Sequence, residues 1–523
     1  MSKVKHGKRQ YKQMALEVAI RNPERLYDFL VTFSKFEGRN LDDACILEIY
    51  AQLYIDKVIV AQNVDFEVMT KNQIYKYIKD NNTHQNEWGF PTGYQAAFCR
   101  YLKTLSEFGF IYSQYNETFK LSDVAKTLIN GDISLSEAFS LQCVRFWRKS
   151  PYRRVLNDFN YFTFLLNALI ELDKKGKRMS INQFMYSLFS IDGNIDEFLD
   201  DLDSHHIGDS PEKAYDLVID KYLNNSGKYK KISKMQTAFR DYGNTVFRVL
   251  QLTGFVSVDS SGIIMLSINK NRLNFYKELL AYNFVLTEEA KEDETLYFNE
   301  IGFMNESILN SIIKYREEET TSTNEYNDKI KNIISSYNLD QESLSTYLLD
   351  LSSGKRDSGC FWFLQAPLKL EFLLTLFLYT CYGDEFNYQP NYKCDDNGIP
   401  YSHAPGNVGD IEIFNASRYW LIEATLIRNK NQQINNETIN LFRHISDKQD
   451  CDKYLSLVAP YIHEDTELMI KVASLIVGVE KKTKIYAGCS DVNDFVKESK
   501  LKNNFLILEG INRELINGIK EYL

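Results

Sequence analysis

Apolar residues recur at helical spacing through much of the first 285 residues, and short strand-like pairs interrupt that pattern. Two stretches, Leu102–Ser113 (LKTLSEFGFIYS) and Phe247–Val258 (FRVLQLTGFVSV), align without gaps about a shared Gly-Phe. In each stretch the pattern predicts a helix that ends at glycine, then a strand, a turn and a second strand. The first part of the chain is therefore expected to contain two similar helix–hairpin units.

The stretch between residues 286 and 350 is acidic. Twelve acidic residues stand against three basic ones between positions 288 and 328. Within it, Tyr315–Asp328 (YREEETTSTNEYND) has the pattern of a helix end, a polar loop and a new helix start. We predict a helical linker here, whose negative charge would keep it away from a polyanion.

The hydrophobic pattern changes again near residue 351. Leu368–Tyr382 is strongly apolar and predicts a helix, and a second helix is expected from about residue 436 to residue 449. Strand patterns occur at Ile411–Phe414, Tyr419–Leu426, Tyr454–Ile462 and Lys484–Cys489. This order of helices and strands predicts an α/β sandwich around a mixed sheet. The whole chain is therefore expected to be a multidomain α+β protein with parts at 1–285, 286–350 and 351–523.

Composition narrows the class of protein. The chain has 523 residues, a net charge of −10 and eight cysteines, which are scattered and form no C-x-x-C pair. A zinc site or a disulfide framework is therefore not expected, and the pattern fits a protein of the reducing cytoplasm. Apolar runs stay shorter than the roughly 18 to 20 residues of a membrane span, and HExxH, P-loop and GxSxG motifs are absent.

Positive charge is concentrated despite the acidic total. Residues 141–180 hold nine basic residues against three acidic ones, and Arg145–Arg154 (RFWRKSPYRR) interleaves bases with aromatic residues. A helix followed by a hairpin is also the winged-helix arrangement, in which a helix can enter the major groove of DNA. Ordinary scaffold helices and a solvated charged face are the alternative interpretation. The side chains expected to contact DNA are Arg100, Lys103, Arg145, Arg148, Lys149, Arg153, Arg154, Arg240, Asn244 and Arg248.

Two carboxylates stand on strands that otherwise look built for burial. Side chains alternate faces along a strand, so Glu423 and Thr425 share one face of Tyr419–Leu426. A tight turn at residues 415–418 would pair this strand with the preceding one and bring Asp410 beside Glu423. Two carboxylates held on a rigid sheet can bind a hard divalent cation such as Mg²⁺. Such an ion can activate water and neutralise charge on a phosphodiester. An Asp followed by a Glu-x-Lys-like pair on the next strand is the layout of PD-(D/E)XK nucleases.

Glu437 and His444 extend this set. Both fall on one face of the helix expected to start after Asn435 or Asn436. An acid near a helix start could simply interact with the helix dipole. If the helix instead packs against the carboxylate face, Glu437 becomes a third metal ligand.

The motifs SHAPGNVGDIEIF, LIEAT and ETINLFRHI resemble, in that order and spacing, the AlwI family of type II restriction endonucleases. The likeness extends over most of the chain and includes type IIS enzymes and large subunits of nicking endonucleases. It implies a PD-(D/E)XK nuclease at 351–523, a DNA-recognition domain at 1–285 and the linker at 286–350. It also implies that Asp410, Glu423 and Glu437 are catalytic and bind Mg²⁺.

Two positions depart from the simplest form of that nuclease motif. Gly409 stands where a proline often precedes the aspartate, and Thr425 stands where a lysine is usual. Lys430 or His444 could supply the missing positive or proton-transferring group. Glu412 is expected to be a carboxylate just outside the direct ligands of the metal, and His403 is expected to cap a turn rather than to touch substrate.

The resemblance implies cleavage of double-stranded DNA a few base pairs outside a short asymmetric site, with the protein in the cytoplasm and away from membranes. One carboxylate set attacks one strand, so cutting both needs a second copy or a small nuclease subunit. The rival interpretations are a non-cleaving winged-helix DNA-binding protein with a degenerate nuclease domain, and a nuclease acting on structured or RNA substrates.

Overall fold

The computed structural model describes residues 9–61, 64, 66–81, 93–208, 210–225, 227–228, 241–318, 323–355, 359–404, 408–428, 430–445 and 451–522. They form two compact units, each described by itself below. Unit 1 comprises Met1–Val258 with Ile263–Glu319, and unit 2 comprises Asp259–Gly262 with Thr320–Leu523. The chain is therefore a multidomain α+β protein, as expected.

Unit 1 is mainly helical. Its helices are α1 (Arg25–Ser34), α2 (Asp43–Ile55), α3 (Lys71–Asp80), α4 (Gly93–Glu107), α5 (Asp123–Ile129), α6 (Leu135–Arg145), α7 (Tyr161–Lys174), α8 (Ile181–Ser187), α9 (Ile195–Ser204), α10 (Pro211–Val218), α12 (Gly243–Leu252), α13 (Leu273–Ala281), α14 (Glu294–Ile301) and α15 (Glu306–Glu318). Short 3₁₀ or π turns lie at η1 (Phe66–Val68), η2 (Ile219–Asn224) and η4 (Lys270–Arg272).

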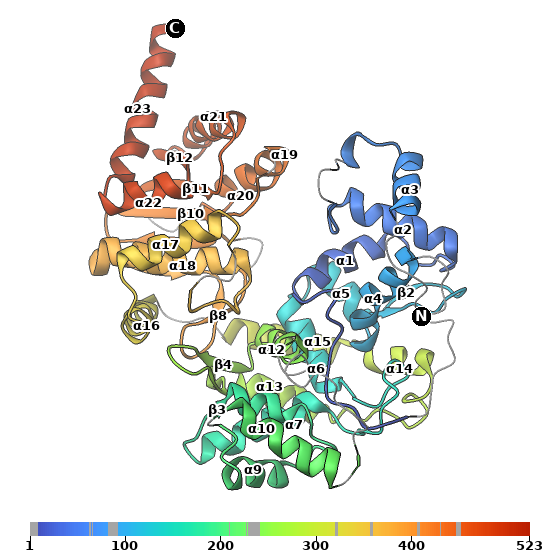
Figure 1. Cartoon of the computed structure of the whole chain (residues 1–523). Coiled ribbons are helices and arrows are strands. Elements are labelled where there is room, and N and C mark those ends of the chain that lie inside the picture. The colour runs from blue at the N-terminus through green and yellow to red at the C-terminus, as the bar shows by residue number, and fades with distance from the viewer. Residues whose placement is uncertain are drawn as a thin grey trace. The chain divides into compact units, whose positions relative to one another are not determined.

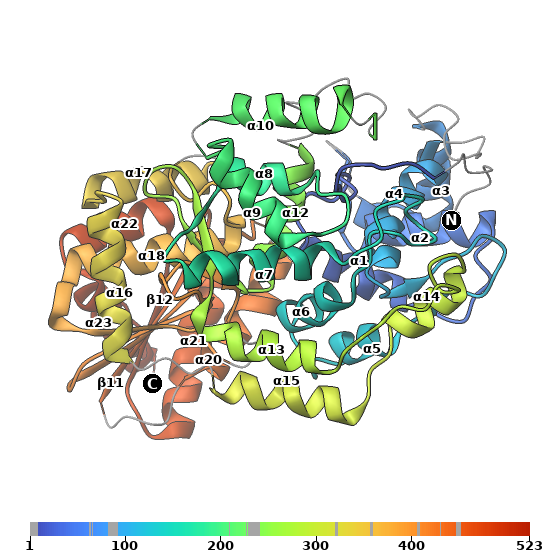
Figure 2. The same ribbon diagram turned by 90° about the horizontal axis from the view of Figure 1, so that it is seen from below.

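Short strands complete the described part of unit 1. β1 (Ile111–Tyr112) pairs with β2 (Lys120–Leu121), and a second sheet has the order β3-β5-β4 from β3 (Met179–Ser180), β4 (Val256–Asp259) and β5 (Met265–Ile268). Helix α7 packs against β5 and α9 beside this sheet (Figure 2).

The two predicted helix–hairpin units are present. Helix α4 is followed by the β1–β2 pair, and α12 is followed by β4 and β5. The shared glycines end the helices as expected, because Gly109 and Gly254 both have a φ of 67°, which costs a side-chain-bearing residue more than glycine.

Unit 2 is an α/β sandwich. Its helices are α16 (Thr323–Ser336), α17 (Gln341–Ser352), α18 (Ala366–Tyr382), α19 (Lys430–Gln432), α20 (Ile439–Arg443), α21 (Glu464–Lys481), α22 (Val492–Lys500) and α23 (Asn504–Tyr522), with η5 (Gly383–Glu385) and η6 (Gln433–Thr438) between them. Its strands are β6 (Asn387–Pro390), β7 (Lys393–Cys394), β8 (Pro400–Ser402), β9 (Ile411–Phe414), β10 (Arg418–Ala424), β11 (Asp452–Ala459) and β12 (Ile485–Asp491).

The main sheet of unit 2 has the order β12-β11-β10-β9-β6. β10 pairs in parallel with β11 and antiparallel with β9, so the sheet is mixed, as predicted. Helices α17 and α18 lie on one side of it, with α20 and α21 on the other (Figure 1). The apolar alternation in β10 explains both layers: Leu421 packs in the cluster that holds Leu441 and Ile470, while Trp420 contacts rings of the opposite layer.

Two predictions about unit 2 need correction. The helix expected from residue 436 begins earlier, because α19, η6 and α20 run together from Lys430 to Arg443, and residues 446–450 lie outside the described part. Edge strand β6 was not predicted, because its Asn-Tyr-Gln-Pro pattern lacks apolar alternation.

The unit boundary falls inside the predicted linker. Helices α14 and α15 belong to unit 1, and α16 and α17 belong to unit 2, so the stretch 286–350 contributes to both. Among the described residues, every helix is too short or too polar to cross a membrane.

Candidate active site

Asp410 and Glu423 face each other at the open end of the β9–β10 hairpin. The register pairs Ile411 with Ile422, and its next step sets Asp410 opposite Glu423. Asn415 forms the expected turn, since its N–H donates to Arg418 O at 2.9 Å. The N–H of Ala424 donates to Asp410 Oδ2 at 2.8 Å. The hairpin therefore fixes one carboxylate beside the other on rigid strands.

A side chain on the residue before Asp410 would crowd two side chains of β10. A Cβ at Gly409 would lie 2.1 Å from Leu421 Cδ1 and 3.1 Å from Glu423 Oε1. Asn391 anchors the same segment, because its Nδ2 donates to Gly409 O at 2.7 Å and to Glu412 Oε1 at 3.0 Å. Glycine at this position thus lets the backbone approach β10 closely.

Glu437 lies in the π turn η6 rather than at a helix start. Helix-dipole stabilisation of a helix N-terminus therefore does not explain this carboxylate, and π turns are frequent at functional sites. Desolvation raises the pKa of Glu437, and a hydrogen bond with Thr425 and the charge of His444 partly offset this rise. The structure thus brings Glu437, Thr425 and His444 together.

His444 joins the same group through Glu423. Its Nδ1 lies 2.7 Å from Glu423 Oε1, and both side chains are only 5% exposed. Lys430, the other possible substitute for the missing lysine, pairs with Asp465 of α21 and is half exposed. Of the two, His444 is the one in contact with a clustered carboxylate.

A fourth carboxylate, which the sequence did not reveal, comes from α18. Glu371 is 3% exposed, and its Oε1 lies 2.8 Å from His403 Nδ1. Its Oε2 is buried and has no hydrogen-bond partner among the residues that the structure describes. The sequence signal for this residue was an acid inside a strongly apolar helix. A buried carboxylate is costly without compensation, so its presence there indicates a function. His403 therefore contacts a buried acid rather than only capping a turn.

The carboxylates interact electrostatically. Desolvation raises the pKa of Asp410 well above its usual range, and the charges of Glu371 and Glu423 raise it further. Desolvation, followed by the charge of Glu437, raises the pKa of Glu423 to about 8. Because neighbouring carboxylates oppose the ionisation of Asp410 and Glu423, these acids need a cation or protons to balance their charge.

Oxygen ligands that are rigid, desolvated and partly unpartnered fit a hard divalent cation. Within the described residues, however, no three acids, histidines or cysteines stand close enough to hold one ion as they are. Asp410 is hydrogen bonded to a backbone N–H, and Glu423 to His444. Holding an ion would therefore require carboxylates to rotate out of these hydrogen bonds.

Two of the arginines expected to contact DNA are buried. Arg145 is 4% exposed and donates to Ile301 O at 2.9 Å and Phe303 O at 2.6 Å. Arg148 is 2% exposed and donates to carbonyls of Ser190 and Lys12. These guanidinium groups satisfy backbone carbonyls inside unit 1, which differs from the expected contact with phosphate.

The other expected DNA contacts differ in exposure. Lys149 pairs with Asp158 and Glu288, each at 3.2 Å, and Arg153 pairs with buried Glu107 at 2.8 Å. Arg154 is exposed, and side chains on α4 and α12 are partly exposed at Arg100, Lys103, Asn244 and Arg248. Arg240 lies outside the described residues.

A family model described as AlwI restriction endonuclease matches residues 106–353 and 360–497. The comparison with curated proteins gave no match.

Among solved structures, the small subunit of the heterodimeric restriction endonuclease R.BspD6I is 21% identical and covers 34% of this chain and 89% of its own, with a TM-score of 0.25. The binding domain of BpuJ1 endonuclease, in complex with modified DNA, is 13% identical over 55% of this chain and 97% of its own, with a TM-score of 0.33. Restriction endonuclease FokI is 10% identical over 96% and 97%, with a TM-score of 0.23. These low scores describe a distant likeness only.

Proposed function

The chain belongs to the AlwI restriction endonuclease family and is a site-specific deoxyribonuclease, and from this premise we propose that it is a type IIS or nicking endonuclease that uses Mg²⁺. In this proposal unit 1 reads a short asymmetric site, and unit 2 hydrolyses a phosphodiester a few base pairs outside it. The observation that supports it most is the cluster of Glu371, Asp410, Glu423 and Glu437, in which burial raises the pKa values of the last three and neighbouring carboxylates raise those of Asp410 and Glu423 further.

Each member of the cluster has a distinct part in the proposal. Asp410, Glu423 and Glu437 would hold the ion, with Glu371 adding a fourth oxygen donor from α18. When bound, the ion supplies an activated water and neutralises charge that develops on the phosphate. Thr425 keeps Glu437 oriented through its hydrogen bond. Burial of these groups excludes bulk water and so strengthens every electrostatic interaction at the site.

We assign the role of the missing lysine to His444. We expect His444→Asn, which can still donate a hydrogen bond to Glu423, to slow cleavage about 100-fold, since it cannot exchange a proton. Lys430→Gln should cleave within about twofold of the parent, because its partner is Asp465 on the surface. Single-turnover cleavage rates of the two variants test this assignment, and a slow Lys430→Gln with a fast His444→Asn would reverse it.

The proposed recognition region is unit 1. Its two helix–hairpin units match the order of a winged helix, and α4 and α12 carry Arg100, Lys103, Asn244 and Arg248 on partly exposed positions. The mixed sheet of unit 2, which lies between helices, supports the proposal that this unit is a PD-(D/E)XK nuclease. A non-cleaving relative with a degenerate nuclease domain is disfavoured, because clustered desolvated acids destabilise a fold that makes no use of them.

Run-off sequencing tests the proposed function directly. A long linear duplex is incubated with the full chain in Mg²⁺ and, separately, in EDTA, and the ends of the products are sequenced. The expected result is discrete ends at a fixed offset from one asymmetric sequence, formed only in Mg²⁺. Ends inside the recognised sequence would reject the type IIS assignment, and equal cleavage in EDTA would reject the role of the metal.

A further inference from the structure

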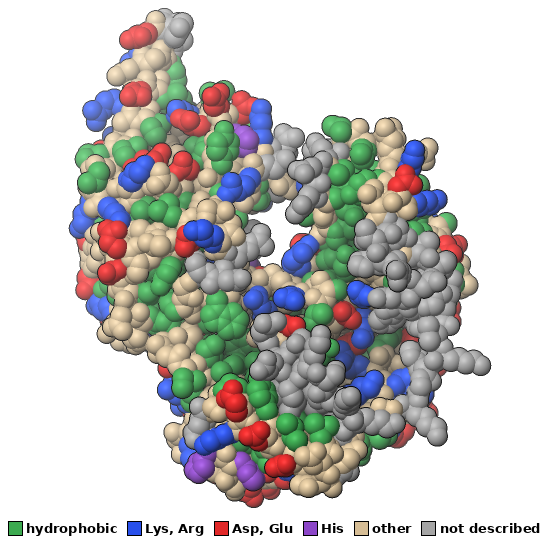
Figure 3. Space-filling view, in the orientation of Figure 1, with side chains coloured by type: hydrophobic (Ala, Val, Ile, Leu, Met, Phe, Trp, Pro, Cys, Tyr) green, Lys and Arg blue, Asp and Glu red, His purple; other side chains and the backbone are tan. Residues whose placement is uncertain are grey.

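His403 lies against a buried acid of the candidate active site. Its Nδ1 is 2.8 Å from Glu371 Oε1, and the side chain of Glu371 is 4% exposed whereas that of His403 is 38% exposed. The histidine side chains that are most visible in Figure 3 lie at the surface near α9 and α21. An ionised carboxylate can only accept hydrogen bonds, so His403 donates from Nδ1–H when Glu371 is ionised. The contact therefore occupies one oxygen of the Glu371 carboxylate.

The position of His403 is set by the β7–β8 hairpin, because the residue directly follows β8. Asp395 closes the turn of this hairpin: its Oδ1 accepts the N–H groups of Asn397 and Ile399 at 3.0 and 2.9 Å. Gly398 completes the turn with a φ of 85°, a conformation that glycine adopts readily. These contacts hold the hairpin in one conformation up to the residue that meets Glu371.

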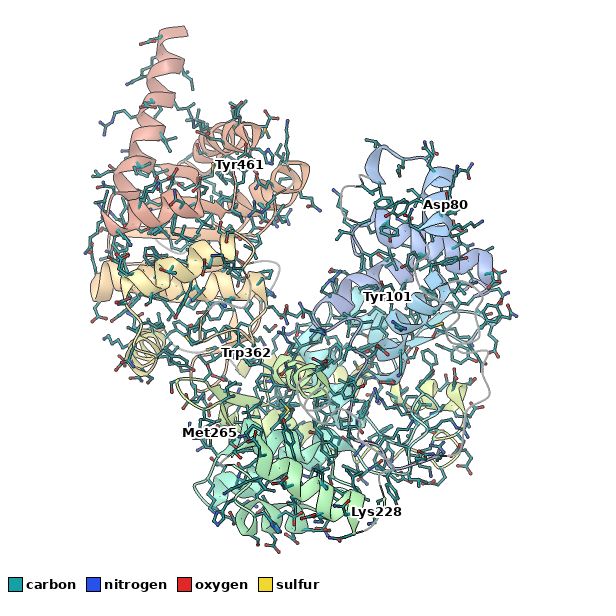
Figure 4. All side chains as sticks on the ribbon, viewed as in Figure 1. Asp80, Tyr101, Lys228, Met265, Trp362 and Tyr461 are labelled. Carbon is teal, nitrogen blue, oxygen red and sulfur yellow. The ribbon has the colours of Figure 1, made fainter. Side chains whose placement is uncertain are left out.

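The hairpin is also held against α18, the helix that carries Glu371. Strand β8 packs on this helix, and the ring of Tyr392, just before β7, lies 6.0 Å from the ring of Phe372. The hydroxyl of Tyr392 is hydrogen bonded to that of Tyr326 in α16, and both residues are buried. Glu371 lies in the second turn of α18, which begins shortly after Trp362, labelled in Figure 4. The end of β8 and the Glu371 carboxylate are therefore fixed beside each other.

The second oxygen of Glu371 belongs to the carboxylate cluster. Oε2 is buried and has no hydrogen-bond partner within the described residues, and the charge of Glu371 acts on both Asp410 and Glu423. Asp410 follows His403 by seven residues, so one segment of the chain carries both groups that act on the Glu371 carboxylate. A carboxylate that is held by a donor at one oxygen presents its other oxygen in a fixed direction.

A purely structural role for His403 is the alternative. A buried carboxylate without a hydrogen bond lowers stability, and His403 offsets that loss at Oε1. A set of contacts that served stability alone would satisfy both oxygens of Glu371. Within the described residues Oε2 has no such partner, so stability alone does not explain the arrangement.

We propose that His403 is a positioning residue, whose Nδ1–H holds Oε1 of Glu371 and thereby keeps Oε2 available to a cation held with Asp410 and Glu423. The inference rests on the proposed function, in which these carboxylates hold Mg²⁺. Histidine suits the role because a neutral imidazole can donate from Nδ1, whereas lysine would add a positive charge that competes with the cation.

Substitution of His403 tests the proposal in the full chain. His403→Leu removes the donor and should slow single-turnover cleavage about 30-fold and raise the Mg²⁺ concentration for half-maximal cleavage at least about tenfold. His403→Asn should restore both to within about threefold of the parent, because its amide nitrogen lies near the position of Nδ1. The amide nitrogen of His403→Gln lies near the position of Nε2 instead, so this variant should resemble His403→Leu. No loss in His403→Leu, or an equal loss in His403→Asn, would overturn the proposal.

A double-mutant cycle shows whether His403 acts through Glu371. In a Glu371→Gln background, His403→Leu should change the cleavage rate by less than about twofold, because the carboxylate that it orients is already absent. Losses that multiply would mean that His403 acts on DNA or on another group, which contradicts the proposal.

Thermal unfolding gives a readout that does not depend on activity. Mg²⁺ should raise the unfolding temperature of the parent, and His403→Leu should lose most of this rise while His403→Asn keeps it. The matched control is Thr375→Val, because Thr375 Oγ1 donates to the backbone O of Glu371 at 2.9 Å and does not contact its carboxylate in this way. This control should unfold at a lower temperature but keep the response to Mg²⁺. Equal loss of the response in Thr375→Val and His403→Leu would leave His403 with a structural role only.

The parent chain separates failure of the inference from failure of the proposed function. A parent that neither cleaves DNA nor responds to Mg²⁺ removes the proposed function and the inference with it. A parent that cleaves in Mg²⁺, together with a His403→Leu variant of the same rate and Mg²⁺ dependence, rejects only the role of His403.

Discussion

We expect Asp410→Asn to lower the rate of DNA cleavage by at least about 10³-fold, which corresponds to about 4 kcal/mol in the barrier. Asp410 stands opposite Glu423 in the hairpin register, and it interacts with every other acid of the cluster. Asparagine keeps the shape and can still accept the hydrogen bond from Ala424 N–H, but it removes the negative charge that a divalent cation requires. Single-turnover cleavage in saturating Mg²⁺ measures the effect.

The matched control for this substitution is Glu412→Gln. Glu412 lies two residues after Asp410, in β9, and accepts a hydrogen bond from Asn391 at 3.0 Å. Its substitution therefore tests the loss of a nearby charge outside the cluster. Its cleavage rate should stay within about tenfold of the parent. DNA binding should be unchanged in both variants, measured without Mg²⁺. Cleavage by Asp410→Asn at the rate of Glu412→Gln would show that the catalytic centre lies elsewhere.

Much of unit 2 could be predicted because the apolar positions in its strands show which side chains are buried. Ile411–Phe414 forms a strand over the expected residues, and the apolar alternation of β10 gives both faces of the sheet. Strand β6 could not be predicted in this way, since β9 supplies its hydrogen bonds and its own sequence is polar. The start of the helical segment at Lys430 was missed because Asn435 and Asn436 resemble a cap, whereas a π turn continues through them.

From the residues alone, the contact between Asp410 and Glu423 was predictable because the two lie close together in the sequence. Asp410 and Glu423 are joined by one tight turn, so the hairpin brings them together without any knowledge of the rest of the fold. Glu371 comes from a helix 39 residues before Asp410, and only the tertiary structure shows that its charge acts on Asp410. The distance between these two residues cannot be derived from the sequence. The sequence indicated Glu371 only as a single acid within an apolar helix.

The basic segment shows why composition alone misleads about nucleic-acid contacts. Arg145 and Arg148 stand among aromatic residues, a pattern typical of a phosphate-binding patch. The same pattern suits a buried arginine, because its five N–H donors can satisfy several loop carbonyls while aromatic rings cover its plane. Hydrogen-bond partners, which depend on distant loops, decide between the two roles.

Removal of divalent metal should stop cleavage and leave a protein whose stability falls as pH rises. In the folded protein the pKa of Glu423 is raised from 4.5 to about 8, so without metal this group keeps its proton up to about pH 8. A raised folded pKa contributes stability that is fully present below pH 4.5 and is lost as pH rises toward 8. Urea unfolding in EDTA should therefore show a declining free energy of unfolding across that window, and Glu423→Gln should flatten the decline.

Metal binding should reverse this dependence, because the ligands must lose their protons to bind a cation. Mg²⁺ is therefore expected to raise the unfolding temperature more at pH 8 than at pH 6, in parallel with a cleavage rate that rises with pH at limiting Mg²⁺. Glu371→Gln should reduce the shift by removing a carboxylate oxygen that has no hydrogen-bond partner within the described part of the chain, whereas Glu412→Gln should keep it. A parent protein whose unfolding temperature is indifferent to Mg²⁺ at both pH values would refute a metal at the four carboxylates, because any ligand that binds only the folded state must stabilise it.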